Sequence, residues 1–136
     1  MTQLPRKVHI MTKTTKPAVL SAGTMIGDPV RNATGDDLGE IKELMIDTDT
    51  GHIAYAVLSF GGFLGIGDKL FAVPWDALGL STEEKKFILN VPKEKLEKAP
   101  GFDKNNWPDM SNREWGGSIY KYYGYAPYWT AGSRER

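Results

Sequence analysis

Residues 52–75 read HIAYAVLSFGGFLGIGDKLFAVPW, two apolar runs joined by a glycine-rich segment. The first run, His52 to Phe60, is apolar on both faces, which is typical of a strand at the centre of a sheet. The second run, Lys69 to Trp75, is shorter, and Pro74 places its end at a sheet edge or a bulge. The stretch therefore predicts two neighbouring strands in a β-rich domain.

The glycine-rich segment between these runs invites comparison with a phosphate-binding loop, which ends in Gly-Lys-Ser/Thr and opens a helix. Counted from Gly62, the second glycine falls correctly at Gly67. The next residue is Asp68, which puts a carboxylate where the phosphate charge would lie, and Leu70 follows Lys69. The segment also leads into a strand and offers no helix N-terminus to an anion. We therefore predict a turn whose glycines supply positive φ angles.

The tip of this turn carries three apolar side chains, Phe63, Leu64 and Ile66. If they are exposed, they form a contact surface, because contiguous apolar surface marks interaction sites. If they fold back, they cap one end of the domain. The residues leave both alternatives open.

The β pattern continues on both sides of this stretch, with short apolar runs separated by turn residues. The run 38–46 does not alternate cleanly, which predicts a bulge near Glu43. Six short strands without a long helix favour an all-β fold, a compact barrel. The remaining expected strands are Met25–Val30, Leu38–Ile46, Leu78–Leu80 and Phe87–Val91.

The sequence DTDTG at 47–51 contains an Asp-Thr-Gly triplet, as aspartic proteases do, and resembles the start of a calcium loop. Polar residues surround the triplet, and Leu58 stands where a calcium loop needs glutamate. Asp and Gly between two strands are what a hairpin turn requires. We predict a turn here. The acidic residues Asp36, Asp37, Glu40 and Glu43 are expected to form a solvated face, with a weak cation site as the alternative.

The composition excludes several classes of protein. The chain of 136 residues has no cysteine, so disulfides, thiolate metal sites and cysteine nucleophiles are excluded. Its net charge is zero, and residues 21–99 hold thirteen acidic against eight basic side chains, which disfavours nucleic-acid binding. No apolar run is long enough for a signal-peptide core or a membrane span, so a cytoplasmic protein is expected.

Three segments are expected along the chain: a flexible basic arm (1–20), the barrel (21–98) and a C-terminal extension (99–136). A short helix is expected between Pro92 and Pro100. The extension holds nine of the fifteen aromatic residues and three of the four tryptophans. Disordered segments are poor in such residues, so the extension must pack on the barrel, on a second copy or on another protein. A stacking platform for RNA or sugar is a further alternative.

Within the extension, Ser111 to Glu114 has the spacing of a capping box. Trp115, Ile119 and Tyr122 follow at helical spacing and predict a short docked helix. The end, YGYAPYW, is expected to be an extended aromatic strap.

Several of these motifs together resemble a PRC-barrel domain over residues 21–98. The resemblance is carried by GDPV (27–30), GDDLGEI (35–41), MID (45–47), GHIAYAV (51–57), GGFLGIGDK (61–69) and FAVPW (71–75). Members of this family form a small bent β-barrel. It occurs in the cytoplasmic part of the photosynthetic reaction-centre H subunit and in the C-terminal domain of a ribosome-maturation factor.

The resemblance implies a protein-interaction module without catalytic residues of its own. Lacking a membrane helix and the preceding domain of the ribosome factor, the sequence is most similar to stand-alone bacterial members, often associated with stress. We accordingly predict a non-enzymatic interaction or assembly module, a homodimer, with no cofactor and no metal. The alternative is a barrel that holds a small aromatic or lipid-like molecule against the extension. The candidate protein-contact residues are Phe63, Leu64, Ile66, Trp115, Tyr122, Tyr128 and Trp129.

Overall fold

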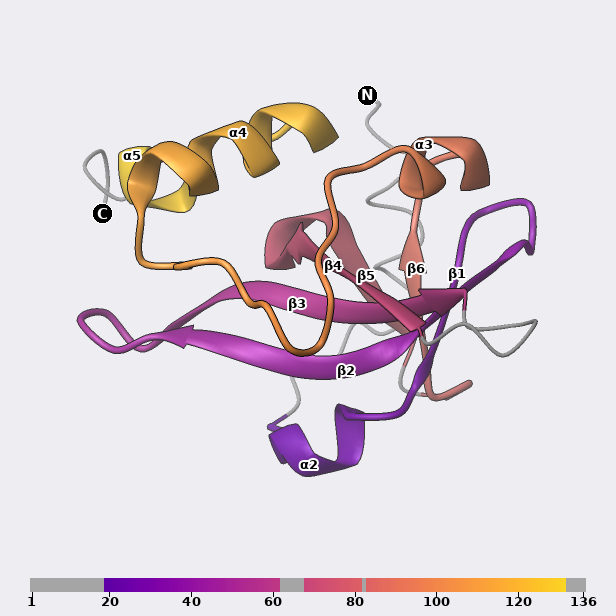
Figure 1. The fold of residues 1–136 in the computed structure, drawn as a ribbon. Coiled ribbons are helices and arrows are strands. Elements are labelled where there is room, and N and C mark those ends of the chain that lie inside the picture. Colours follow the sequence, from indigo (N-terminus) through magenta and orange to yellow (C-terminus); the bar gives the residue numbers. More distant parts are fainter. Residues whose placement is uncertain (1–18, 62–67, 82, 132–136) are drawn as a thin grey trace, which may run out of the picture.

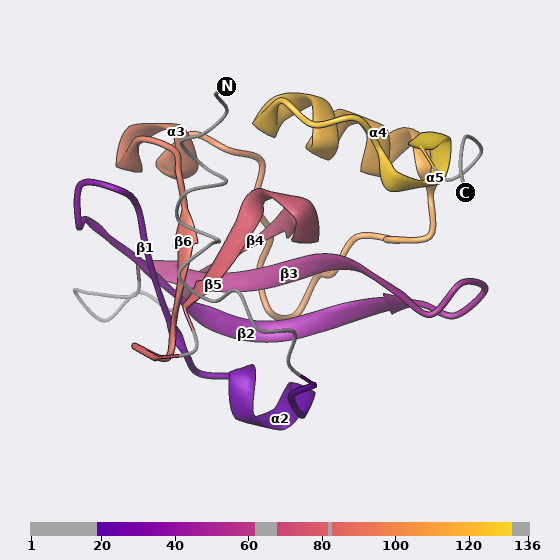
Figure 2. The same cartoon turned by 180° about the vertical axis from the view of Figure 1, so that it is seen from behind.

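A computed structural model describes residues 19–61, 68–81 and 83–131. Six strands form one curled sheet, and short helices lie on both of its sides, with α2 on one side and α3, α4 and α5 on the other (Figures 1 and 2). The elements are α2 (Ala22–Met25), β1 (Pro29–Arg31), β2 (Asp37–Asp47), β3 (His52–Gly61), β4 (Asp68–Pro74), the 3-10 turn η1 (Trp75–Ala77), β5 (Leu78–Ser81), β6 (Lys86–Leu89), α3 (Lys93–Glu97), α4 (Arg113–Tyr123) and α5 (Tyr128–Ala131).

The strand order is β4-β3-β2-β1-β6-β5. All neighbours are antiparallel except β1 and β6, which pair in parallel through Val30 with Phe87 and Arg31 with Ile88. This mixed sheet forms a half-barrel, and it confirms the prediction of a small bent barrel of six strands. The expected strands at 38–46, 52–60, 69–75, 78–80 and 87–91 correspond to β2 to β6 with small differences at their ends.

Strand β2 is irregular at the point where a bulge was predicted. Its register against β3 shifts between Ile41 and Glu43 and again between Met45 and Ile46. Upstream of these shifts, Gly39 has a φ of +96°, and a Cβ atom there would lie 2.1 Å from the carbonyl oxygen of Ser59. Only glycine combines this backbone conformation with so close an approach of two strands. The glycine of the GDDLGEI motif is therefore a packing requirement of the β2–β3 pair.

The expected first strand at Met25–Val30 is wrong in its first half. Residues Ala22–Met25 form a helical turn instead, because the Ser21 side chain accepts a hydrogen bond from the Thr24 N–H at 3.2 Å. Gly27, at a φ of +95°, then redirects the chain, and β1 begins at Pro29. Met25 remains buried and anchors this turn on the barrel.

The barrel interior is apolar and largely aliphatic. Six side chains spread over five strands are fully buried, and at about 25 cal/mol per Å² such burial is the main source of stability. They are Val30, Leu38, Ile41, Leu58, Val73 and Phe87. Leu96 of α3 and Ile119 of α4 join the same core.

The C-terminal extension packs on the barrel through α4, one of the alternatives that the sequence left open. Its N-cap is Asn112, one residue after the expected Ser111, and the Asn112 Oδ1 accepts from the N–H groups of Glu114 and Trp115 at 2.8 and 3.1 Å. Its buried face is also shifted by one residue: Ile119 is buried as expected, but its partners are Gly116, Tyr120 and Tyr123.

The expected extended strap at the end of the chain is wrong. Gly124 ends α4 in the left-handed conformation at a φ of +86°, and residues Tyr128–Ala131 form the short helix α5. The left-handed glycine cap reverses the chain, so α5 returns beside α4 (Figure 1).

Before α4, the extension also covers the outer edge of β4. The N–H of Leu70 donates to the carbonyl of Phe102 at 2.9 Å, and the N–H of Phe102 donates back to the carbonyl of Leu70 at 2.8 Å. The indole of Trp107 lies against the ring of Phe102, with centroids 5.1 Å apart. One residue of the extension thus pairs with an edge that β3 leaves open.

Candidate functional site

The DTDTG segment is the hairpin turn between β2 and β3, as predicted. Asp47 Oδ1 accepts from the N–H of Asp49 at 2.9 Å, and the N–H of Gly51 donates to the carbonyl of Asp47 at 2.7 Å. Gly51 adopts a φ of +80°, which a turn of this kind requires. The Asp-Thr-Gly triplet therefore belongs to the turn that reverses the chain between β2 and β3.

The carboxylate of Asp47 ties this hairpin to the end of the chain. Its Oδ2 accepts a short hydrogen bond from the Tyr128 hydroxyl and lies 3.5 Å from the Arg113 Nη2. The Arg113 Nη1 in turn donates to the Tyr128 hydroxyl at 3.3 Å. The Tyr128 hydrogen bond, the Asp49 N–H and the Arg113 charge hold the pKa of Asp47 below its usual value. Asp47 is therefore ionised at neutral pH and fully occupied by three donors.

Stacked rings hold Tyr128 and Arg113 in place. The ring of His52 stacks on that of Tyr128, with centroids 4.7 Å apart and planes at 9°. The Arg113 guanidinium lies 4.4 Å above the Trp129 ring centroid, a favourable cation–π distance. These contacts fix α5 against the hairpin although 66 residues separate Arg113 from Asp47.

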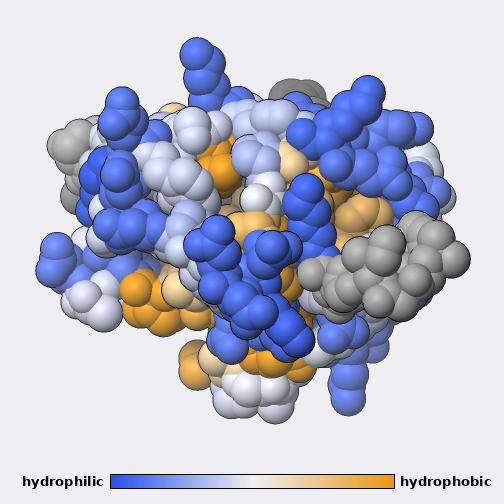
Figure 3. Space-filling view, viewed as in Figure 1, coloured by the Kyte–Doolittle hydropathy of each residue, from blue (hydrophilic) through white to orange (hydrophobic). Residues whose placement is uncertain are grey.

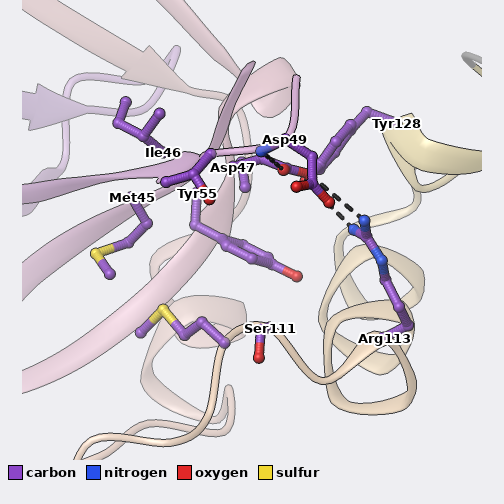
Figure 4. Close-up of a pocket in the computed structure, with 11 residues that line it drawn as sticks. Met45, Ile46, Asp47, Asp49, Tyr55, Ser111, Arg113 and Tyr128 are labelled. Carbon is purple, nitrogen blue, oxygen red and sulfur yellow. Dashed lines mark hydrogen bonds and ion pairs between the residues drawn. The ribbon is translucent and has the colours of Figure 1, made fainter. Parts of the chain in front are cut away.

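A pocket of about 550 Å³ opens between the hairpin and the extension (Figure 4). This volume falls within the range typical of small-molecule sites. Its walls combine thioether and aliphatic side chains with hydroxyl, carboxylate and guanidinium groups. The lining residues are Met45, Ile46, Asp47, Thr48, Asp49, Ala54, Tyr55, Met110, Ser111, Arg113 and Tyr128.

Tyr55 contributes an unusual group to this pocket. Its side chain is only 2% exposed, and its hydroxyl points toward Ser111 and Arg113 (Figure 4). Within the described part of the chain, this hydroxyl has no hydrogen-bond partner, whereas the hydroxyl of the neighbouring Tyr120 donates to the carbonyl of Ala54 at 2.7 Å. Burial, with a smaller contribution from Tyr128, raises the pKa of Tyr55 to about 12. The Tyr55 hydroxyl is thus neutral and available as a donor.

Gly116 sets the position of the Tyr55 ring. A Cβ atom at Gly116 would lie 2.1 Å from the Tyr55 hydroxyl oxygen and 2.9 Å from the Trp129 ring. The sequence suggests only that Gly116 weakens a helix. The structure shows that its missing side chain makes room for the tyrosine that reaches the pocket.

The candidate contact residues fall into two groups. Phe63, Leu64 and Ile66 lie outside the described residues, although Gly61 pairs with Asp68, so their segment does connect two antiparallel strands. The four aromatic residues of the extension all have partners within the chain. Tyr128 is buried, whereas Trp115, Tyr122 and Trp129 are half-buried.

The contacts of these half-buried residues are with the barrel and with neighbouring helices. The Trp115 ring lies 5.4 Å from that of Tyr55, and the Trp129 ring lies 5.5 Å from that of Tyr120. The Tyr122 hydroxyl donates to the carbonyl of Lys95 at 2.6 Å. Contact with another protein is a prediction for the remaining exposed edges of these rings.

Sequence reasoning missed the pocket residues Asp47 and Arg113 as a pair, and it did not single out Tyr55 as a residue of a site. Tyr55 lies among buried residues, together with Val57, Phe71 and Val73. A polar atom at the end of an interior tyrosine was the one available signal, because a buried hydroxyl needs a partner. Nothing in the sequence could bring Arg113 to Asp47.

Two acidic residues at the start of β2 and in the preceding turn have local partners. The Asp36 carboxylate accepts from the Asn32 amide at 3.1 Å, and Asp37 lies 3.8 Å from Arg31. In residues 19–61, 68–81 and 83–131, no group of three His, Cys, Asp or Glu side chains is arranged to hold a metal ion. Over the same ranges, no helix has the length and apolar character needed to cross a bilayer.

The fold and the site together define a small half-barrel module with an aromatic extension docked over one side. The family model of the PRC-barrel domain matches residues 18–96, more than half of the chain. The chain therefore belongs to the PRC-barrel domain family, whose members are generally non-catalytic. No curated protein matches the sequence at a significant level.

Proposed function

We propose that this protein is a non-catalytic interaction and assembly module, and that its first partner is a second copy of itself. The family supports the general role, since PRC-barrel domains often mediate protein interactions. A cytoplasmic location, predicted from the sequence, and an association with stress, predicted by resemblance, belong to the same proposal.

The observation that carries this proposal is apolar surface around α2. Leu20 and Ile26 flank this helical turn and are 43% and 37% exposed, and Val19 is fully exposed. Figure 3 shows apolar side chains at the surface over α2, at the bottom of the view. Because Met25 anchors the turn in the core, these side chains are held outward on a fixed support. Apolar surface of this kind is typical of protein contacts.

The oligomeric state in solution tests the proposal. We expect the wild-type protein to be a dimer by light scattering coupled to size-exclusion chromatography. The double variant Leu20→Ser/Ile26→Ser should shift it to a monomer without changing its circular dichroism spectrum. Ile46→Ser is the matched control, because Ile46 is 50% exposed but lies on β2, away from α2.

The second contact candidate, the 63–66 segment, is tested in the same way with Phe63→Ser/Leu64→Ser. If only this variant loses the dimer, the dimer interface is formed by the 63–66 segment and not by the surface around α2. A wild-type protein that stays monomeric at the highest attainable concentration would overturn the homodimer.

The pocket favours a second function, the binding of a small molecule between barrel and extension. The observation that favours it is the Tyr55 hydroxyl, which reaches this pocket without a hydrogen-bond partner from the described chain. A ligand that accepts from this hydroxyl would supply the missing partner. Titration with small aromatic probes, described below, tests this function independently of the oligomeric state.

A further inference from the structure

The pocket between the β2–β3 hairpin and the extension has a neutral interior and an acidic mouth. Asp47 and Arg113 neutralise each other, and the carboxylate of Asp47 is already occupied by three donors. Asp49 is exposed, and its carboxylate has no partner in the described part of the chain. The ionisable side chains around the pocket therefore sum to one negative charge, and this charge lies on the solvent side.

This charge pattern discriminates against charged ligands. An anion would have to pass the exposed carboxylate of Asp49 at the mouth of the pocket, and like charges repel. A cation in the interior would lie beside the Arg113 guanidinium, which is fixed over the Trp129 ring. An uncharged ligand meets neither penalty.

The hydrogen-bonding groups of the pocket determine which polar group a ligand needs. The Tyr55 hydroxyl stays protonated at neutral pH and can donate. The Arg113 guanidinium has five N–H groups in all, and two of them point to Asp47 and Tyr128. Both residues line the pocket, together with Ser111 (Figure 4). The pocket therefore offers hydrogen-bond donors to an acceptor oxygen.

The apolar walls complete the site. Met45 of β2 and Met110, which precedes α4, both line the pocket. Methionine side chains are flexible and polarisable, and their sulfur atoms make favourable contacts with aromatic rings. They would cover a flat apolar group attached to the acceptor.

We propose that this pocket binds an uncharged small molecule, with a carbonyl or hydroxyl oxygen accepting from Tyr55 and Arg113 and an apolar, preferably aromatic, part between Met45 and Met110. This inference rests on the ligand-binding function proposed above and adds to it the chemical class of the ligand. The interaction with a second copy of the chain is independent of it.

Three probes of nearly equal shape separate the charge classes: benzamide is neutral, benzoate is an anion and benzamidine is a cation at neutral pH. Binding is measured on full-length protein with isotope-labelled methionine methyl groups, since the chain has only five methionines. Met45 and Met110 report on the pocket, and Met25, buried in the core, is the internal control. We expect benzamide to shift Met45 and Met110 saturably, with a Kd in the millimolar range. Benzoate and benzamidine should bind at least about fivefold more weakly.

Two tyrosine variants test the hydrogen bond. Tyr55→Phe should weaken benzamide binding about fivefold or more, which is the usual effect of losing one hydrogen bond. Tyr123→Phe is the matched control, because the Tyr123 hydroxyl, like that of Tyr55, has no partner among the described residues, but it does not line the pocket. It should leave binding unchanged. Neither variant should lower the melting temperature, since neither hydroxyl is bonded within the described chain.

The outcomes separate the two proposals. If no probe shifts the pocket methionines saturably, both the ligand-binding function and the inferred ligand class are wrong. If benzoate or benzamidine binds more tightly than benzamide, the pocket binds ligands but the uncharged class is wrong. If Tyr55→Phe binds benzamide with unchanged affinity, the Tyr55 hydroxyl does not contribute to the binding site.

Discussion

The barrel interior and the interface between barrel and extension are both buried, but different chemistry holds them together. The interior is largely aliphatic, with side chains such as Leu38 and Ile41 at 0% exposure. The interface is aromatic and partly polar, with Tyr55 and Tyr120 in edge-to-face contact and with hydroxyl groups that are only partly satisfied. The stability of an aliphatic interior depends on the buried area and on how completely the volume is filled. The stability of the aromatic interface depends also on individual hydrogen-bonding atoms. This interface leaves room for a pocket.

The largest expected effect on stability comes from Gly39→Ala, which disturbs the pairing of β2 and β3 in the barrel. The new Cβ would lie 2.1 Å from the Ser59 carbonyl oxygen and would force an L-residue into a φ of +96°. We expect a loss of about 3 kcal/mol or more in the free energy of unfolding, measured by chemical denaturation. Gly51→Ala is the control: its φ is +80°, but no atom lies within 4 Å, so strain alone should cost about 1 kcal/mol. Equal losses in the two variants would contradict close strand approach at Gly39.

A smaller effect is expected at the interface from Gly116→Ala. Alanine favours a helix by about 1 kcal/mol over glycine, but here its Cβ would meet the Tyr55 hydroxyl and the Trp129 ring. Overpacking of this kind costs about 1–3 kcal/mol, so we expect a net loss of about 1 kcal/mol in thermal or chemical unfolding.

Gly117→Ala, one residue further in the same helix, serves as the control. A Cβ at Gly117 has no neighbour within 4 Å, so only the gain of about 1 kcal/mol in helix propensity should remain. If both substitutions stabilise the protein, α4 does not rest on Tyr55 as closely as described.

The smallest effect per group is expected from alkaline pH, which perturbs the interface and spares the aliphatic interior. Burial raises the pKa of Tyr55 to about 12 and also raises the pKa values of Tyr120 and Tyr123. The folded state therefore holds these protons above pH 10 while the unfolded chain releases them. Their contribution to stability is complete below about pH 9 and falls as pH rises above about 10; for Tyr55 the fall ends near its folded pKa of about 12, whereas for Tyr120 and Tyr123 it continues to higher pH.

At about pH 10.5 the loss should be less than about 1 kcal/mol for each of these tyrosines. Melting temperatures as a function of pH, with tyrosinate absorbance on the same samples, measure it. Release of all six tyrosine protons at the ordinary tyrosine pKa, with native circular dichroism retained, would show that the interface is open to water.

The sequence was informative wherever short-range patterns control structure. The run 52–60 predicted β3, and the broken alternation of 38–46 predicted the bulge near Glu43. It failed where a cap decides between helix and strand: Ser21 turns residues 22–25 into a helix, and Gly124 reverses the chain before α5. Such caps depend on single hydrogen bonds or single φ angles, which periodicity does not record.

The candidate site was only partly predictable. An aromatic extension packed on the barrel was among the expected alternatives, and a ligand between the two was one expected function. The pocket itself depends on Asp47 meeting Arg113 and Tyr128, which lie 66 and 81 residues further along the chain. Those contacts exist only after the whole domain has folded, so no local pattern in the sequence encodes them.

The pairing of Phe102 with Leu70 has a consequence for synthesis of the chain. During translation β4 emerges well before Phe102, so its outer backbone groups stay unpaired while the barrel forms. Open strand edges of this kind recruit strands from other molecules. Until Phe102 has been synthesised, the backbone groups of Leu70 at this edge stay open to such pairing, and the extension then closes the edge at that residue.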